Sequence, residues 1–460
     1  MGRKRIIIAT MGDFNRYSDV NYKFDKPAFS EEKEFRSRYG PAALAKAIMA
    51  EKIIVLLPLS LLPVAQDISC DGNFSTDCLK RDVLNFIKGE FSESESKPEI
   101  DLHIVVNNGE FIVDNSRRLR IEAPSGAVHI SSYLGILEAL SNEQEADLYV
   151  DTTHSINSVL IEALDAVELA VRTLVVSGNK KFRLKYVSSE PYYKGVTGLN
   201  YLEFKRESFL DKDKKVASSL SYIFSLPDSI MDENDLKRLF ELMGIPSGIG
   251  RALHESFDIF RKGEIFLTGI YHRFYEYIYK KIISFLKNEF LNEEKFLKRN
   301  EGNLFIIGMQ SKENNLSGKF WIISAVLSYL FILSTPKLSF DKEISLKELK
   351  HRIEEIHLPD FHVLFLKNEI NSIANIVEGK YTDGDGKKTW IALSDIVSTQ
   401  KPESDENHTK SPCSFDERNM RAHGGLERNV TWFMINENGD LLISYKECLH
   451  NLARRLLKFD

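Results

Sequence analysis

Short apolar runs alternate with amphipathic segments along the chain up to about residue 205. Each apolar run has the length of a strand buried in a sheet, and each amphipathic segment is long enough to form a helix. This alternation is typical of a parallel or mixed α/β sheet. The predicted strands are Arg5–Thr10, Lys52–Leu57, Asp101–Val106, Asp147–Asp151 and Phe182–Val187.

Two of the segments between these strands carry clear helical signals. In GPAALAKAIMA, Pro41 suits a first helical turn, and Leu44, Ile48 and Met49 share one apolar face. The segment after DTTHS repeats apolar residues at helical spacing with mostly polar residues opposite, namely Ile156, Leu160, Leu164, Val167, Val171 and Leu174. A strand, a polar turn and a long helix are therefore predicted in succession here.

After about Lys205 the strand pattern stops and long helical patterns replace it. The clearest is FLTGIYHRFYEYIYKKIISFLKNEF, and the uncharged stretch Phe320–Leu333 is too short to span a bilayer, which predicts a buried helix. We predict an α/β domain at residues 1–205 and a helical region at residues 206–460. The acidic stretch near residues 215–262 could form a small helix–turn–helix.

Composition narrows the class of protein. A chain of 460 residues exceeds one ordinary core, so two or three domains are expected. The formal net charge of −6 gives no basic field for sequence-independent binding of nucleic acid. The four cysteines, Cys70, Cys78, Cys413 and Cys448, lack the density and spacing of a disulfide scaffold, which predicts a reducing, cytoplasmic setting. No membrane association is expected, because the apolar stretch Phe320–Leu333 is too short to span a bilayer.

Polar residues follow three of the predicted strands. In open α/β sheets ligands bind beyond the carboxyl ends of the strands, where loops and helix N-termini offer donors to anions. These residues could together face a nucleotide-like ligand: Thr10, Gly12, Thr153, His154, Ser155, Asn157 and Ser188. The alternative is that Thr152, Thr153 and Ser155 only cap the following helix.

A second group of polar residues lies near the end of the chain, in ERNMRAHGGLERN. On a helix Asn419 and His423 stand four residues apart, so the amide can orient the imidazole, and Arg418 lies around the same turn. Gly424 and Gly425 favour a helix end there, which would leave His423 open to a phosphate. The alternative is that these residues are merely the polar face of a helix.

Taken together, the two motifs resemble the CRISPR-associated type III accessory ribonucleases, which have an N-terminal CARF domain and a C-terminal HEPN domain. DTTHSIN (Asp151–Asn157) is similar to the aspartate–x–threonine–histidine turn of that family, and RNMRAH (Arg418–His423) matches the HEPN pattern. The resemblance implies a Rossmann-like CARF sheet domain that binds a cyclic oligoadenylate, with Asp151 among the ligand-binding residues. It also implies a helical HEPN domain that forms a ribonuclease site with a second HEPN domain.

In that reading the 2′-hydroxyl of single-stranded RNA attacks the neighbouring phosphorus and leaves a 2′,3′-cyclic phosphate. His423 would transfer protons, Arg418 would stabilise phosphorane charge, and Asn419 would position His423 or the phosphate. No metal or other cofactor is expected, and the resemblance favours cyclic tetra-adenylate as the activator. Because one chain supplies one such histidine, a homodimer or larger homo-oligomer is expected.

A different class of protein also fits part of the pattern. A nucleotide-sensing transcriptional regulator without catalysis would combine the α/β domain with a DNA-binding helix. Such a helix needs Lys and Arg facing phosphates. The candidate helix–turn–helix instead carries the acidic residues Asp232, Glu233, Asp235 and Glu241. The sequence therefore favours the ribonuclease.

Overall fold

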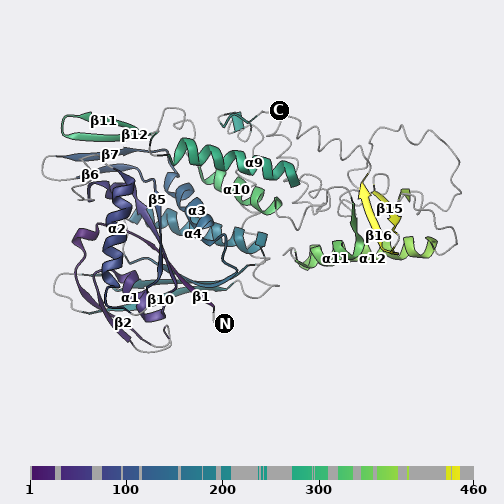
Figure 1. The fold of residues 1–460 in the computed structure, drawn as a ribbon, viewed down its shortest axis with the longest axis horizontal. Coiled ribbons are helices and arrows are strands. Elements are labelled where there is room, and N and C mark those ends of the chain that lie inside the picture. The colour runs from purple at the N-terminus through teal and green to yellow at the C-terminus, as the bar shows by residue number, and fades with distance from the viewer. Residues whose placement is uncertain are drawn as a thin grey trace. The chain divides into compact units, whose positions relative to one another are not determined.

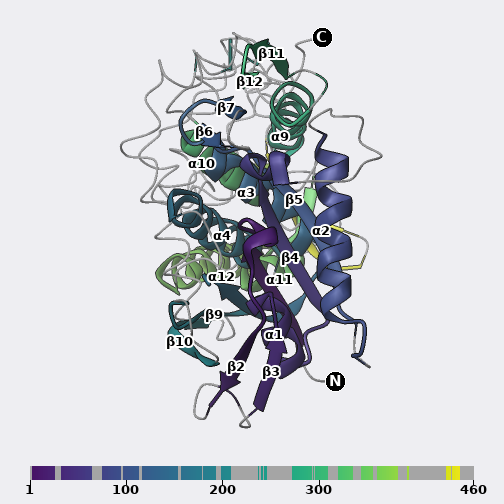
Figure 2. The ribbon, with the colours of Figure 1, turned by 90° about the vertical axis from the view of Figure 1, so that its left-hand side faces the viewer.

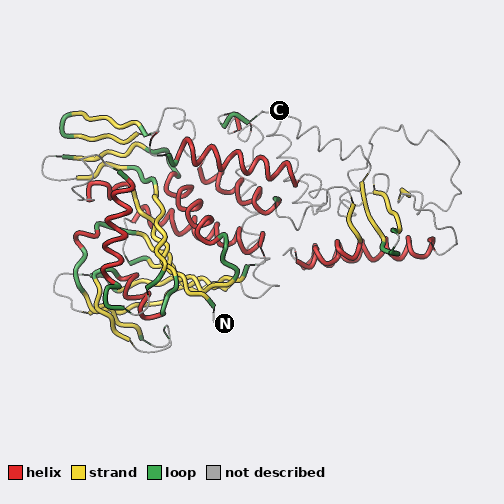
Figure 3. The backbone as a smooth tube through the Cα atoms, viewed as in Figure 1, coloured by secondary structure: helices red, strands yellow, loops and turns green. Residues whose placement is uncertain are grey.

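The fold is taken from a computed structural model, shown as a ribbon in Figure 1 and as a backbone trace in Figure 3. The structure describes residues 3–25, 29, 33–64, 75–94, 97–112, 117–153, 157–178, 180–192, 198–208, 237, 240–241, 243–245, 272–292, 294, 296–308, 320–334, 343–355, 360–381, 391–392, 431–436 and 438–445.

An eight-stranded mixed sheet forms the centre of the N-terminal part, in the order β3-β2-β10-β9-β8-β1-β4-β5. All five predicted strands are present in it as β1, β4, β5, β8 and β9, and they are parallel. The strands β1 and β4 are almost wholly buried, which explains their continuous apolar runs. The strand bounds are β1 Lys4–Thr10, β2 Val20–Phe24, β3 Lys33–Ser37, β4 Lys52–Pro58, β5 Glu99–Val105, β8 Glu145–Asp151, β9 Lys181–Ser189 and β10 Gly198–Ser208.

Helices cover both faces of this sheet. Figures 1 and 2 show α1 and α2 on one face and α3 and α4 on the other, as right-handed crossovers in opposite directions from β1 require. Both predicted helices are present, because α1 begins at Gly40 with Pro41 in its first turn and α4 follows the DTTHS turn. The bounds are α1 Gly40–Ile48, α2 Thr76–Glu90, α3 Ala127–Leu140 and α4 Asn157–Gly178, with short 3-10 helices at Phe14–Arg16 and Leu59–Val64.

A second sheet has the order β11-β12-β7-β6, so it joins strands that are far apart in the sequence. Its members are β6 Gly109–Ile112, β7 Arg118–Glu122, β11 Leu297–Glu301 and β12 Leu304–Gly308, and β12 runs parallel to β7. This pairing places residues 284–326 in the first of two compact units, which also holds residues 1–175 and 180–211. The domain boundary expected at residue 205 stays a prediction.

The second unit comprises residues 176–179, 212–283 and 327–460. A four-stranded sheet lies in it, in the order β13-β16-β15-β14. The strand bounds are β13 Glu343–Ser345, β14 Ile391–Ala392, β15 Thr431–Ile435 and β16 Leu441–Tyr445. In the C-terminal part of the chain, the described helices are α9 His272–Phe285, continued by a π-helical turn at Leu286–Phe290, α10 Phe320–Leu333, α11 Leu346–Glu355 and α12 Asp360–Tyr381.

The helical character predicted for the C-terminal part is confirmed, but the expectation that strands stop after about Lys205 is wrong. All five residues of β11 are exposed, so this strand has no apolar alternation to detect, and β13 and β14 are only 3 and 2 residues long. The segment Phe320–Leu333 is the predicted buried helix, with Ser324 and Ser328 fully buried beside its apolar residues. Among the described helices none is long and apolar enough to cross a membrane.

The structure places one of the four cysteines. Cys78, in the first turn of α2, is disulfide-bonded. The other three cysteines lie outside the described residues. The cytoplasmic setting, which rested on reduced thiols, stays a prediction. The expected helix–turn–helix also lies outside the described residues except for Lys237, Phe240–Glu241 and Met243–Ile245.

Candidate functional site

The strand order reverses beside β1. From β1 the chain proceeds to β4 and β5 on one side, and it later adds β8 and β9 on the other side. A crevice opens at such a reversal in doubly wound sheets, and ligands bind there beyond the carboxyl ends of the strands. The register pairs Ala9 with Asp151, which brings the polar ends of β1 and β8 next to each other. Thr10 and Asp151, two of the predicted ligand-binding residues, therefore end neighbouring strands at this reversal.

The turn after β1 depends on Gly12. The Gly12 backbone N–H donates to the Tyr17 hydroxyl at 2.7 Å. A Cβ atom at this position would lie 2.9 Å from that hydroxyl oxygen, closer than real Cβ contacts allow. The residue before the turn, Thr10, is buried at the end of β1. Gly12 is therefore required for a close approach of backbone to side chain, whether or not a ligand is bound.

The turn after β8 is built around the carboxylate of Asp151, a residue that is 2 % exposed. The Tyr201 hydroxyl donates to Oδ2 at 2.6 Å, and the Thr153 backbone N–H donates to Oδ1 at 2.8 Å. The Thr153 hydroxyl donates to the Tyr201 hydroxyl at 3.3 Å and accepts from the Ser189 backbone N–H at 2.9 Å. Four residues from β8, β9 and β10 thus form one hydrogen-bonded network.

This network shows whether the two threonines of the turn, Thr152 and Thr153, only cap the helix that follows. The helix α4 begins at Asn157, four residues beyond Thr153. The Thr152 hydroxyl donates to the Val187 carbonyl, and the Thr153 hydroxyl bonds to Tyr201 and Ser189. The two threonines therefore tie the turn to β9 and β10 instead of capping α4.

Of the other predicted ligand-binding residues, the structure describes Ser188 and the backbone of Asn157. The Ser188 hydroxyl is half-buried at the end of β9 and donates to the Ser189 carbonyl at 3.1 Å. Asn157 is the first residue of α4, and His154 and Ser155 lie outside the described residues. Sequence reasoning missed Tyr201, whose only sequence signal is an aromatic residue within the strand-like stretch GLNYLEF.

Burial raises the pKa of Asp151 from 3.8 to about 6, although the hydrogen bonds from Tyr201 and Thr153 favour the ionised form. The folded protein thus binds this proton more tightly than the unfolded chain. The stability that the protonated carboxyl contributes is present below pH 3.8 and is lost as the pH rises through about 6.

We predict that Asp151→Asn removes this pH dependence. Between pH about 4 and about 7, the free energy of unfolding of the wild type should fall relative to that of Asp151→Asn by up to about 3 kcal/mol. Urea unfolding of both proteins across this range measures the difference. Parallel profiles would show that the carboxyl has an ordinary pKa.

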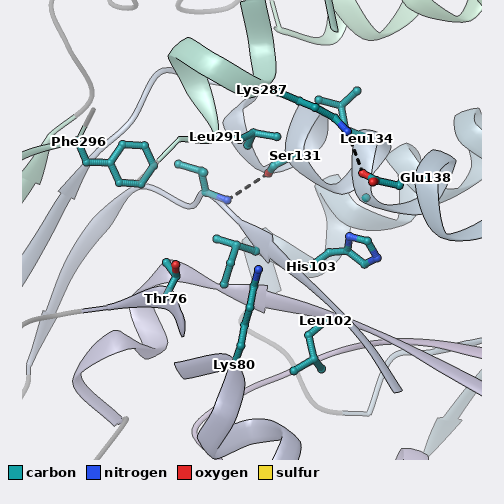
Figure 4. A pocket seen from close by; sticks show the side chains of 13 residues that line it. Thr76, Lys80, Leu102, His103, Ser131, Leu134, Glu138, Lys287, Leu291 and Phe296 are labelled. Carbon is teal, nitrogen blue, oxygen red and sulfur yellow. Dashed lines mark hydrogen bonds and ion pairs between the residues drawn. The ribbon is translucent and has the colours of Figure 1, made fainter. Parts of the chain in front are cut away.

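A cavity of about 180 Å³ lies elsewhere in the first unit, beside β5 and α3. Figure 4 shows Lys287 and Glu138 pointing toward each other at its rim, with 3.3 Å between Nζ and Oε2. The Ser131 hydroxyl accepts from the Val106 backbone N–H at 3.1 Å. The lining includes none of the residues predicted to bind a ligand.

The predicted catalytic residues Arg418, Asn419 and His423 lie outside the described residues. In the chain they fall between β14 and β15, which pair antiparallel with Ile391 opposite Phe433. Among the described residues, no group of three or more His, Cys, Asp or Glu side chains could hold a metal ion.

Comparison with known families assigns a class to each end of the chain. The CARF domain model of the CRISPR system endoribonuclease Csx1 matches residues 6–191, which include β1 through β9. The HEPN domain model of the same endoribonuclease matches residues 361–447, a range that includes Arg418, Asn419 and His423. The chain is thus a CARF–HEPN protein with a Rossmann-like sensor domain and a C-terminal nuclease domain.

It belongs to the CRISPR-associated type III accessory ribonucleases and is an endoribonuclease. The chain is 23 % identical over 467 residues to the CRISPR system endoribonuclease Csx1 of Methanocaldococcus jannaschii, with 97 % of this chain and 90 % of the relative covered. A solved structure of Enterococcus italicus Csm6 bound to cyclic hexa-2′-fluoro-hexa-dAMP covers 84 % of this chain and 88 % of its own, at 8 % identity. The TM-score between the two structures is 0.25. The alternative of a non-catalytic transcriptional regulator is not supported.

Proposed function

We propose that the chain is an endoribonuclease activated by a cyclic oligoadenylate, and that it cleaves single-stranded RNA without a metal ion. The observation that carries the proposal is that one chain combines polar turns at the strand-order reversal of a CARF sheet with a HEPN range that includes Arg418, Asn419 and His423. The first is suited to binding an anionic ligand and the second to transferring protons at a phosphate.

The chemistry requires only a proton-transfer group and a cation. The RNA 2′-hydroxyl loses its proton and its oxygen forms a bond to phosphorus. The bond from phosphorus to the 5′-oxygen breaks, and that oxygen takes up a proton. His423 is the proton-transfer group, Arg418 stabilises the charge on the phosphorane oxygens, and Asn419 positions His423 or the phosphate.

Two chains together suit this chemistry better than one. The motif supplies a single histidine per chain, whereas the reaction needs one group to take a proton and another to give one. A homodimer that joins two HEPN domains would supply both, so we propose a dimer or a larger homo-oligomer as the active form.

The activator would bind at the turns after β1 and β8, with contributions from Thr10, Gly12, Thr153, His154, Ser155, Asn157 and Ser188. The 22-residue helix α4 begins directly after the second turn, and a helix N-terminus favours phosphate. Asp151 would act indirectly, because its carboxylate already accepts from Tyr201 and Thr153. We propose cyclic tetra-adenylate as the activator on family resemblance alone.

An RNA-cleavage assay with and without cyclic oligoadenylates tests the proposal. We expect little cleavage alone, a large increase with cyclic tetra-adenylate, and full activity in EDTA, because the reaction uses side chains alone. The products should carry 2′,3′-cyclic phosphate and 5′-hydroxyl ends. If EDTA abolished cleavage and added magnesium or manganese restored it, the metal-independent 2′-hydroxyl mechanism would be wrong. If no cyclic oligoadenylate changed the cleavage rate, the proposed activation would be wrong.

A further inference from the structure

Tyr201 contributes the only β10 side chain in the hydrogen-bonded network described above, and its hydroxyl lies between Asp151 and Thr153. Each hydroxyl has a single proton to donate. The Tyr201 proton goes to Asp151, and the Thr153 proton goes to Tyr201. Thr153 therefore has no donor left for a ligand phosphate in this arrangement.

The Tyr201 ring is held firmly in place. It is 2 % exposed, and it stacks on Phe24 with 4.9 Å between ring centroids and 15° between ring planes. The Tyr22 ring is a second aromatic neighbour of Tyr201, with 5.5 Å between the ring centroids. Both neighbours come from β2, which pairs with β10, so the hydroxyl position is set by the sheet itself.

The turn after β8 takes its position from this hydroxyl. Both Asp151 oxygens accept hydrogen bonds, one from Tyr201 and one from the backbone of Thr153, so the carboxylate links the ring to the turn. Thr153 in turn holds the Ser189 backbone at the end of β9. Without the Tyr201 hydroxyl, the buried Asp151 carboxylate would lose one hydrogen-bond donor, and the turn would lose its link to β10.

We propose that Tyr201 is a positioning residue for the activator: it holds the Asp151–Thr153 turn, at the strand-order reversal, in the conformation that allows an oligoadenylate phosphate to bind there. This inference rests on the proposed function. It also revises the proposed function at one residue: Thr153 contributes to activator binding from inside the network and not by direct contact with the ligand.

Binding of cyclic tetra-adenylate and of cyclic hexa-adenylate to the full-length chain tests the proposal, with calorimetry for affinity and RNA cleavage for activation. Tyr201→Phe removes only the hydroxyl and keeps the stacked ring. We expect it to weaken binding of the activating ring about tenfold, because one hydrogen bond to a charged group is lost. Saturating activator should restore the maximal cleavage rate, which a general loss of folded protein would not permit.

Tyr22→Phe is the matched control, because it removes the hydroxyl of a buried ring beside Tyr201, and the four hydrogen bonds that define the network do not include Tyr22. Its affinity should stay near that of the wild type. Thr153→Val provides a second, independent variant. Because both residues act through one turn, the double variant should lose little more affinity than either single variant.

The outcomes distinguish a failure of the proposed function from a failure of the role proposed for Tyr201. If the wild type binds neither ring, the proposed function is wrong and the role of Tyr201 falls with it. If the wild type binds and Tyr201→Phe binds equally well, only the positioning role is wrong. Additive losses in the double variant would show that Thr153 contacts the ligand itself, which also overturns the assignment. Should Tyr201→Phe not fold, Thr153→Val decides, since unchanged affinity there removes the network from activator binding.

Discussion

Replacing His423 by alanine is expected to reduce activated RNA cleavage by a factor on the order of 10² to 10⁴, since one proton-transfer group is lost. The reaction must move a proton off the 2′-hydroxyl and onto the 5′-oxygen. In the matched HEPN range the Arg418–His423 motif supplies the imidazole suited to this, since an imidazole titrates nearest neutral pH. Initial rates at saturating activator measure the effect.

A control separates catalysis from folding. His351 lies exposed on α11, so His351→Ala removes an imidazole from the same compact unit and leaves the six residues of the motif unchanged in sequence. We expect His351→Ala to cleave at the wild-type rate and both variants to unfold at the wild-type temperature. Cleavage by His423→Ala at a near-normal rate would show that His423 is not the proton-transfer group.

The second large effect concerns control of the nuclease. Ser155→Glu is expected to raise the activator concentration needed for half-maximal cleavage by about tenfold to a hundredfold, because a carboxylate a few ångströms from a phosphate costs about 1–3 kcal/mol. A ligand can shift the nuclease only if it binds the active arrangement better than the inactive one, so weaker binding weakens activation. An activator titration of RNA cleavage measures the shift.

Ser155→Gln is the matched control, because it has nearly the same size as glutamate and no charge. If repulsion is the cause, the glutamine variant should need much less additional activator than the glutamate variant, and added salt should narrow the gap. Superimposable curves for Ser155→Glu and the wild type would remove this turn from the regulatory site. An equal loss of basal and activated rates would indicate a folding defect.

The Rossmann-like core could be predicted because its signals are local. The strands β1 and β4 are buried on both faces, so their sequences RIIIAT and KIIVLL are apolar without interruption. The helix α10 has the bounds that its uncharged run predicted, and α1 begins where Pro41 indicated. The two motifs that led to the CARF–HEPN family are also short stretches of contiguous residues, and both fall within the matched ranges.

Pairing between distant strands left no such signal. The strand β12 pairs with β7, which precedes it by more than a third of the chain, and β11 exposes every residue. A strand pattern shows which residues are extended but not which strand they join, because the partner lies elsewhere in the sequence. The second sheet and the attachment of residues 284–326 to the first unit therefore required the tertiary structure.

The same distinction holds within the candidate site. The sequence alone was enough to select the turns at Gly12 and Thr153, because polar residues after buried strands are visible locally. The sequence could not show that the Asp151 carboxylate accepts a hydrogen bond from Tyr201. These residues are fifty positions apart and meet only when β10 pairs with β9 beside β8. Local chemistry therefore predicted the turn, and strand pairing decided which side chains hold the turn in place.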